Sequence, residues 1–147
     1  MIVDDAKYMR EMLEEIVETS EGYEIAGVAA DGEEAIAKYL ELMDAGLRPD
    51  IVTMDIVMPN ADGIAVIREL KRYDPDARIL AISALGSPDT IDRAMDAGAQ
   101  DYITKPFSDM SHNNRVLYKF SIWILNNRKN SHSPCINIHS IFFNILN

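Results

Sequence analysis

The sequence contains almost no cysteine, since Cys135 is the only one among 147 residues. A disulfide needs two cysteines, so none forms within the chain, and metal sites built from several cysteine ligands are excluded as well. This residue usage favours a reducing compartment, and we expect the protein to be cytoplasmic.

Long hydrophobic runs and basic residues are also scarce. The apolar runs fall short of the roughly 20 residues that a membrane-spanning helix needs, and the first residues do not form a signal peptide. The 24 acidic and 14 basic residues give a formal charge of -10. Such a charge repels phosphate backbones and anionic membranes. We therefore expect no membrane span and no direct nucleic-acid partner.

Short apolar runs alternate with helical patterns from residue 1 to residue 106. The predicted strands cover residues 1–3, 23–29, 51–55, 78–83 and 100–104. The letters Met-Asp-Ala-Gly end two of the helices between them, at 43–46 and 95–98. Alternation of strand and helix predicts an α/β fold, a doubly wound five-stranded parallel sheet with helices on both faces.

Polar residues stand where four of these strands end: the pair Asp4 and Asp5, then Asp55, Ser83 and Lys105. Each alone is more often a turn former, a helix cap or a solvated side chain. In parallel sheets, however, ligands bind beyond the carboxyl ends of the strands, so all of them converge on one edge. Carboxylates gathered there repel each other, and they either take up protons or recruit a cation.

Oxygen ligands without histidine or cysteine suit a hard divalent ion such as Mg2+. A carboxylate such as Asp55 can then attack a phosphoryl donor, provided that cations and hydrogen-bond donors meet the charge on the phosphoryl oxygens. Mg2+, the Lys105 ammonium and the Ser83 hydroxyl would supply them.

Four segments occur in a characteristic order: Val3-Asp4-Asp5, Met54 to Pro59 with Asp62-Gly63, Ile82-Ser83-Ala84, and Asp101 to Phe107. This ordered set resembles the signature of the CheY-like receiver domains of two-component response regulators. The resemblance covers residues 1–107 and implies a flavodoxin-like strand order of 2-1-3-4-5. It also implies a phosphorelay switch, possibly of the chemotaxis type, that accepts a phosphoryl group from a histidine kinase.

The resemblance assigns roles to individual residues. Asp55 would be the phosphoacceptor, Asp5 a direct Mg2+ ligand and Asp4 a water-mediated one, with the Val57 backbone carbonyl completing the protein ligands. Lys105 and Ser83 would contact the phosphoryl group.

In the family, the Ser or Thr moves toward the phosphate and the aromatic residue turns inward. Ser83 and Tyr102 would therefore form the switch that reshapes a protein-binding face, whose downstream partner the sequence does not identify. Val57, two residues after Asp55, offers no side chain to position a hydrolytic water. We expect a domain that phosphorylates itself and loses the group slowly, not an enzyme that acts on other molecules.

Residues 108–147 depart from the family. They hold four basic residues and one acidic residue, a net of +3, which leaves -13 on residues 1–107. Segments rich in Asn and Ser stand where receivers continue into a fifth helix, and only Val116 to Leu125 keeps a helical pattern. We expect a receiver domain at 1–107 with its fifth helix replaced by a divergent tail. The tail is either the remnant of an interrupted gene or an extension that binds a partner or dimerises.

Three other functions fit parts of the sequence. A Mg2+-dependent phosphohydrolase also uses an aspartate nucleophile at a strand end, but it usually carries a second aspartate where this chain has Val57. A nucleotide- or flavin-binding domain would need a glycine-rich phosphate loop, and none follows a predicted strand. A truncated receiver that acts only as an interaction module is the third alternative.

Overall fold

The computed structural model describes residues 1–18 and 23–105. In chain order its elements are β1 (Ile2–Val3), α1 (Lys7–Glu18), β2 (Val28–Ala29), α2 (Gly32–Asp44), β3 (Val52–Asp55), β4 (Val57–Met58), β5 (Ala61–Asp62), α3 (Gly63–Tyr73), β6 (Ile79–Ser83), α4 (Pro88–Asp96) and β7 (Asp101–Thr104).

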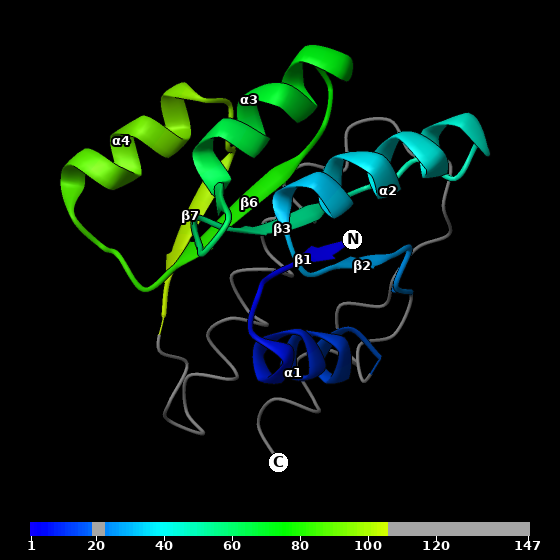
Figure 1. Ribbon diagram of the computed structural model, residues 1–147, viewed down its shortest axis with the longest axis horizontal. Coiled ribbons are helices and arrows are strands. Elements are labelled where there is room, and N and C mark those ends of the chain that lie inside the picture. Colours follow the sequence, from blue (N-terminus) through cyan, green and yellow to red (C-terminus); the bar gives the residue numbers. More distant parts are fainter. Residues whose placement is uncertain (19–22, 106–147) are drawn as a thin grey trace, which may run out of the picture.

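The main sheet has five parallel strands in the order β2-β1-β3-β6-β7. Counted within this sheet, that is the order 2-1-3-4-5, so the predicted flavodoxin-like arrangement is confirmed. Among the described helices, α1 lies on one side of the sheet, while α2, α3 and α4 lie on the other (Figure 1). The order places β3, which ends on Asp55, in the centre.

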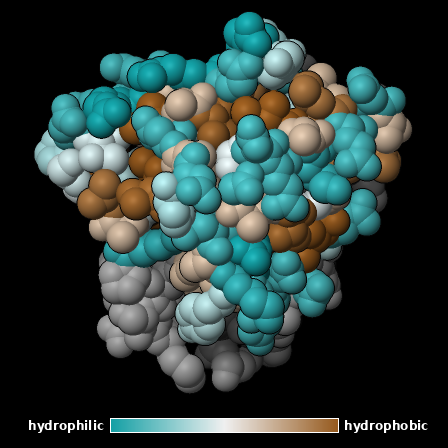
Figure 2. All heavy atoms as spheres, in the orientation of Figure 1, coloured by the Kyte–Doolittle hydropathy of each residue, from teal (hydrophilic) through white to brown (hydrophobic). Residues whose placement is uncertain are grey.

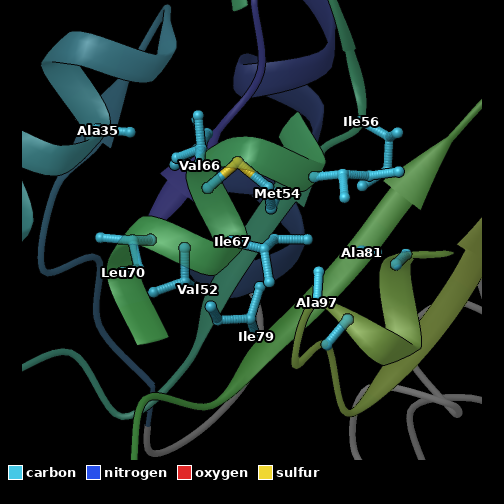
Figure 3. Close-up of a cluster of buried hydrophobic side chains, with 14 of the residues drawn as sticks. Ala35, Val52, Met54, Ile56, Val66, Ile67, Leu70, Ile79, Ala81 and Ala97 are labelled. Carbon is cyan, nitrogen blue, oxygen red and sulfur yellow. The ribbon is translucent and has the colours of Figure 1, made fainter. Parts of the chain in front are cut away.

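The larger core cluster fills the space between the sheet and α2, α3 and α4. Val52 and Met54 of β3 meet Ile67 and Leu70 of α3, and all four side chains are fully buried (Figure 3). A smaller cluster on the α1 side includes Leu13. Both faces of the central strands are therefore covered, which explains their continuous apolar runs. Each large aliphatic side chain buried in this way contributes about 1.5–3 kcal/mol.

The repeated Met-Asp-Ala-Gly letters end α2 and α4 with the same geometry. The N–H groups of Gly46 and Leu47 donate to the carbonyls of Met43 and Leu42, at 3.0 and 2.8 Å, and Gly98 and Ala99 repeat this pattern after α4. Gly46 and Gly98 adopt φ angles of 73° and 111°, which L side chains rarely adopt. The two glycines thus stop both helices at the same edge of the sheet.

Two local predictions differ from the structure. The strand predicted at 23–29 is only Val28–Ala29, because its neighbour β1 offers just Ile2 and Val3 for pairing. A small antiparallel hairpin, β4 with β5, follows β3 and was not predicted. The predicted tail and the replacement of the fifth helix lie outside the described residues.

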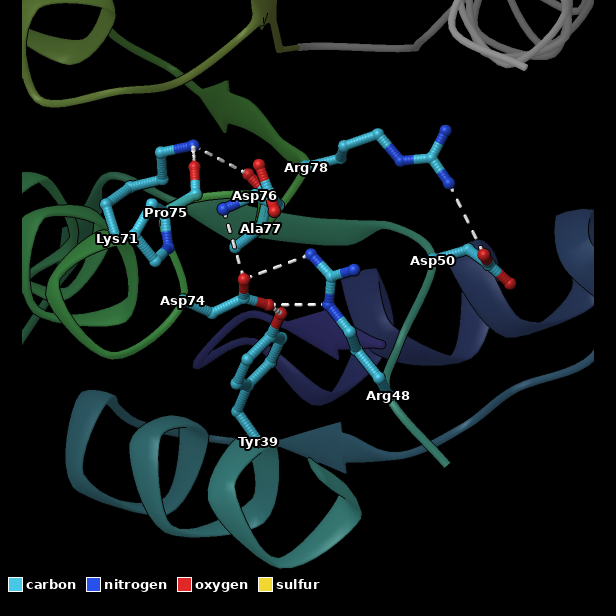
Figure 4. A network of polar contacts seen from close by, with 9 residues as sticks. All are labelled: Tyr39, Arg48, Asp50, Lys71, Asp74, Pro75, Asp76, Ala77 and Arg78. Carbon is cyan, nitrogen blue, oxygen red and sulfur yellow. Dashed lines mark hydrogen bonds and ion pairs between the residues drawn. The ribbon is translucent and has the colours of Figure 1, made fainter. Parts of the chain in front are cut away.

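The edge of the sheet opposite Asp55 carries a buried polar network (Figure 4). Asp74, just after α3, accepts a hydrogen bond from the Tyr39 hydroxyl at 2.6 Å. It also accepts two from Arg48, at 2.6 and 3.1 Å. The Asp76 N–H donates to the same carboxylate at 3.1 Å. These bonds join α2, the segment before β3 and the end of α3.

The surface above α2, α3 and α4 carries hydrophilic side chains over most of its area, with separate hydrophobic areas between them (Figure 2). Tyr8 and Leu47 are the most exposed large apolar residues of the described chain, at 73% and 63%. Within residues 1–18 and 23–105, no helix is long and apolar enough to cross a membrane.

Candidate functional site

The loop after β1 supplies two of the site's carboxylates. Asp4 is only 1% exposed, and its Oδ1 accepts a hydrogen bond from the Ala6 N–H at 3.0 Å. Asp5 is exposed. From α1, the Arg10 guanidinium donates to the backbone carbonyls of Asp4 and Asp5, an interaction that the sequence analysis did not find.

Asp55 is the last residue of β3 and is 4% exposed. Its Oδ1 accepts a hydrogen bond from the Val57 N–H at 3.0 Å, which fixes the carboxylate against the hairpin. The start of α3 passes very close behind it. A Cβ atom at Gly63 would lie 2.1 Å from the Asp55 carbonyl oxygen, so only glycine fits there.

Lys105 follows β7 and reaches across the sheet edge to two carboxylates. Its Nζ lies 2.7 Å from Asp4 Oδ2 and 2.7 Å from Asp55 Oδ2, and its side chain is 14% exposed. Its own N–H donates to the Ser83 carbonyl at 2.7 Å. The structure therefore joins β1, β3, β6 and β7 at this lysine.

Burial and charge act against each other in this cluster. Burial raises the pKa of the Asp55 carboxyl above its usual value, although hydrogen bonds from Lys105 and Val57 oppose the rise. Burial alone would lower the pKa of Lys105, but the bonds to Asp4 and Asp55 outweigh it and raise that pKa. Asp55 therefore carries its negative charge at a cost, while Lys105 is held firmly in its charged form.

Oxygen atoms of Asp4, Asp5 and Asp55 lie within 4.8 Å of one another. Three carboxylates next to one ammonium leave an excess of negative charge in a partly buried place. All the side-chain donors are hard oxygens, so the residues fit a divalent cation such as Mg2+. Near Val57, the structure shows the N–H bond to Asp55, and the metal role of the Val57 carbonyl stays a prediction.

Ser83 and Tyr102 meet at the loop after β6. Ser83 is fully buried, and its Oγ accepts a hydrogen bond from the Leu85 N–H at 3.1 Å. Tyr102 is 8% exposed, and its hydroxyl donates to the Leu85 carbonyl. The two predicted switch residues therefore hold opposite ends of the same residue. Because Asp55 pairs with Ile82 in the sheet, Ser83 lies one position beyond the strand partner of Asp55.

An open hollow of about 470 Å³ borders the hairpin next to Asp55. Val57 and Leu85 line it, and each is 50% exposed. Both side chains are apolar, so neither offers a group to hold a water molecule beside the carboxylate.

Comparison with known proteins agrees with this geometry. The family model of the response regulator receiver domain matches residues 1–116. The chemotaxis protein CheY of Thermotoga maritima is 50% identical over 107 residues, which are 73% of this chain and 84% of the relative. The CheY of Bacillus subtilis is 44% identical over 107 residues, with the same two coverages.

A solved structure is similar as well. It is the crystal structure of the CheX–CheY–BeF3–Mg2+ complex from Borrelia burgdorferi. The match has a TM-score of 0.72 at 38% identity and covers 83% of this chain and 86% of that chain. The predicted resemblance is confirmed, and the chain belongs to the family of response regulator receiver domains.

Proposed function

We propose that this receiver accepts a phosphoryl group on Asp55 from a histidine kinase, with Mg2+ held by Asp4, Asp5 and Asp55. The observation that carries the proposal is the place of Asp55. It is a buried carboxylate at the end of the central strand, next to two further carboxylates and bonded to Lys105. The similar Borrelia CheY was solved with BeF3 and Mg2+, which supports the same ligand chemistry.

The residues divide the transfer between them. An oxygen of Asp55 forms a bond to phosphorus, while the bond from phosphorus to the imidazole nitrogen of the kinase's phosphohistidine breaks and that nitrogen keeps the electron pair. Bound Mg2+ would neutralise charge on the phosphoryl oxygens and on the carboxylates. Lys105, now bonded to Asp4 and Asp55, turns toward the new phosphoryl oxygens. The Val57 N–H keeps the carboxylate oriented.

The output of the switch follows from the Leu85 residue. Phosphorylation adds about -1.5 to -2 charges beside the loop. To donate to a phosphoryl oxygen, the Ser83 hydroxyl turns away from the Leu85 N–H that it now accepts from. Because the Leu85 carbonyl holds the Tyr102 hydroxyl, this rearrangement reaches Tyr102 and the surface around it. A downstream protein would bind that reshaped surface.

The test is phosphorylation by a small phosphodonor in Mg2+ buffer, followed by intact mass. Wild type gains one phosphoryl group, and Asp55→Asn gains none. Asp62→Asn is the matched control, because Asp62 caps α3 and asparagine caps a helix equally well. Equal uptake by wild type and Asp55→Asn would refute the assignment. Steady turnover of a phosphomonoester by wild type would instead favour the phosphohydrolase.

Receiver domains are generally not enzymes, and self-dephosphorylation here should be slow. Val57 and Leu85 place apolar side chains beside Asp55, where no group positions a water molecule for attack. We expect radiolabelled protein to keep its label well beyond seconds in Mg2+ buffer. Loss within seconds would contradict this.

The relatives suggest the setting. Proteins named chemotaxis protein CheY are the similar relatives in Thermotoga maritima and Bacillus subtilis, and the Borrelia CheY forms a complex with CheX. A chemotaxis-type role in the cytoplasm, with a protein as downstream partner, is the corresponding proposal for this chain.

A boundary at residue 107 stays a prediction, and the family model continues to residue 116. Limited proteolysis tests it, because a tail that survives while exposed loops are cut would argue against an unstructured remnant.

A further inference from the structure

Arg10 contacts the acidic loop through the backbone and not through the carboxylates. Its Nη1 donates to the Asp4 carbonyl at 2.8 Å and to the Asp5 carbonyl at 2.9 Å. Arg10 lies in α1, so a regular helix anchors it. The planar guanidinium carries its donors in a fixed geometry, and it can therefore orient two neighbouring carbonyls from one nitrogen.

The two carbonyls belong to the residues that carry the first two carboxylates of the site. Fixing a carbonyl fixes its peptide plane, since the peptide unit is planar. The Ala6 N–H adds a third restraint, because it donates to Asp4 Oδ1 at 3.0 Å. Arg10 and Ala6 together restrain the loop in which the carboxylates of Asp4 and Asp5 approach Asp55 within 4.8 Å.

Resting on the function proposed above, we propose that Arg10 is a positioning residue for the cation site. It holds the loop after β1 in its binding geometry before a cation arrives, so that ordering the loop is not part of the cost of binding. Groups that orient metal ligands in this way typically change metal affinity by about 10- to 100-fold when they are removed.

The charge of Arg10 provides a sharp alternative, because it acts in the opposite direction. A guanidinium beside three carboxylates repels an incoming cation. If Arg10 acted only through its charge, Arg10→Ala would bind Mg2+ more tightly than wild type. If Arg10 positions the loop, Arg10→Ala binds Mg2+ more weakly although the site has become more negative. The sign of the change therefore separates the two roles.

The experiment is calorimetric titration of the full chain with Mg2+. We expect Arg10→Ala to raise the Kd about 10- to 100-fold, and Arg10→Lys to restore part of the loss, because lysine keeps a charged donor. Lys7→Ala is the matched control. It removes one positive charge from the same helix, and Lys7 is exposed and pairs with Glu11. Its affinity should stay close to that of wild type.

A second measurement needs no metal. Hydrogen exchange at the Ala6 amide should be faster in metal-free Arg10→Ala than in wild type, because the loop has lost its anchor. Arg10→Gln, a milder change, keeps the test available if the alanine variant does not fold. Unchanged or tighter Mg2+ binding by the Arg10 variants, from a wild type that binds Mg2+ and is phosphorylated, would overturn the role of Arg10 alone. A wild type that binds no Mg2+ would refute the proposed function, and the exchange measurement would still decide whether Arg10 holds the loop.

Discussion

The two edges of the sheet solve the problem of a buried carboxylate in opposite ways. At the amino-terminal edge, Asp74 receives bonds from Tyr39, Arg48 and a backbone N–H, so one negative charge meets one guanidinium. At the carboxyl-terminal edge, three carboxylates share Lys105, with Arg10 bonded only to their backbone. The first edge is electrostatically complete, whereas the second keeps an excess of negative charge.

The pKa shifts follow this difference. Burial alone would raise the pKa of the Asp74 carboxyl, but the bonds from Tyr39 and Arg48 lower it below its usual value. Burial raises the pKa of Asp55 in spite of Lys105. The ionised Asp74 therefore stabilises the fold, while the ionised Asp55 costs stability. Such an opposition is typical of a structural network and a functional site within one domain.

The largest expected effect comes from breaking the network at the amino-terminal edge. Asp74→Ala removes the acceptor of Tyr39 and Arg48 and should lower the free energy of unfolding by roughly 2–4 kcal/mol. Asp50→Ala is the control, because Asp50 is 83% exposed and its pair with Arg78 should contribute less than about 1 kcal/mol. Urea unfolding measures both. Equal losses would mean that the two edges do not differ as described.

The second test uses pH. Burial and the bond to Asp74 raise the pKa of Tyr39 to about 12. A raised pKa stabilises the fold below the unfolded value near 10, and this contribution is lost as pH rises toward 12. Tyr39→Phe should cost about 1–2 kcal/mol at pH 7, and its difference from wild type should shrink between pH 10 and 12. A difference that stays constant over that range would contradict the network.

The smallest expected effect has the opposite sign and belongs to the carboxyl-terminal edge. In buffer with EDTA, Asp55→Asn removes an ionised carboxylate whose raised pKa shows that it costs stability. The unfolding free energy should rise by on the order of 1 kcal/mol. Added Mg2+ should stabilise wild type more than the variant. A loss of stability without Mg2+ would show that the Lys105 bond outweighs the repulsion.

The sequence predicts the carboxyl-terminal edge better than the amino-terminal one. Asp55, Ser83 and Lys105 each follow an apolar run, and one rule about parallel sheets then brings them to one edge. Tyr39 and Asp74 are 35 positions apart, and Arg48 and Asp74 are 26 apart. No periodic pattern connects them, so their pairing is visible only in the folded chain.

Backbone partners are also hidden from sequence patterns. Arg10 lies on the expected first helix, but its acceptors are carbonyls, which every residue carries. The hairpin of β4 and β5 has strands of two residues each, too short for an alternating pattern. The length of β2 depends on β1 and not on its own letters, which is why the prediction of 23–29 was too long.

The lysine at the end of β7 gives the domain a check on its own synthesis. Lys105 is separated by 101 positions from Asp4 and by 50 from Asp55, and it contacts both. A nascent chain that has formed β1 and β3 but has not yet docked β7 has its acceptor without this lysine. Signalling competence should therefore appear abruptly, when residue 105 reaches its place, and a half-made chain should stay silent toward the kinase.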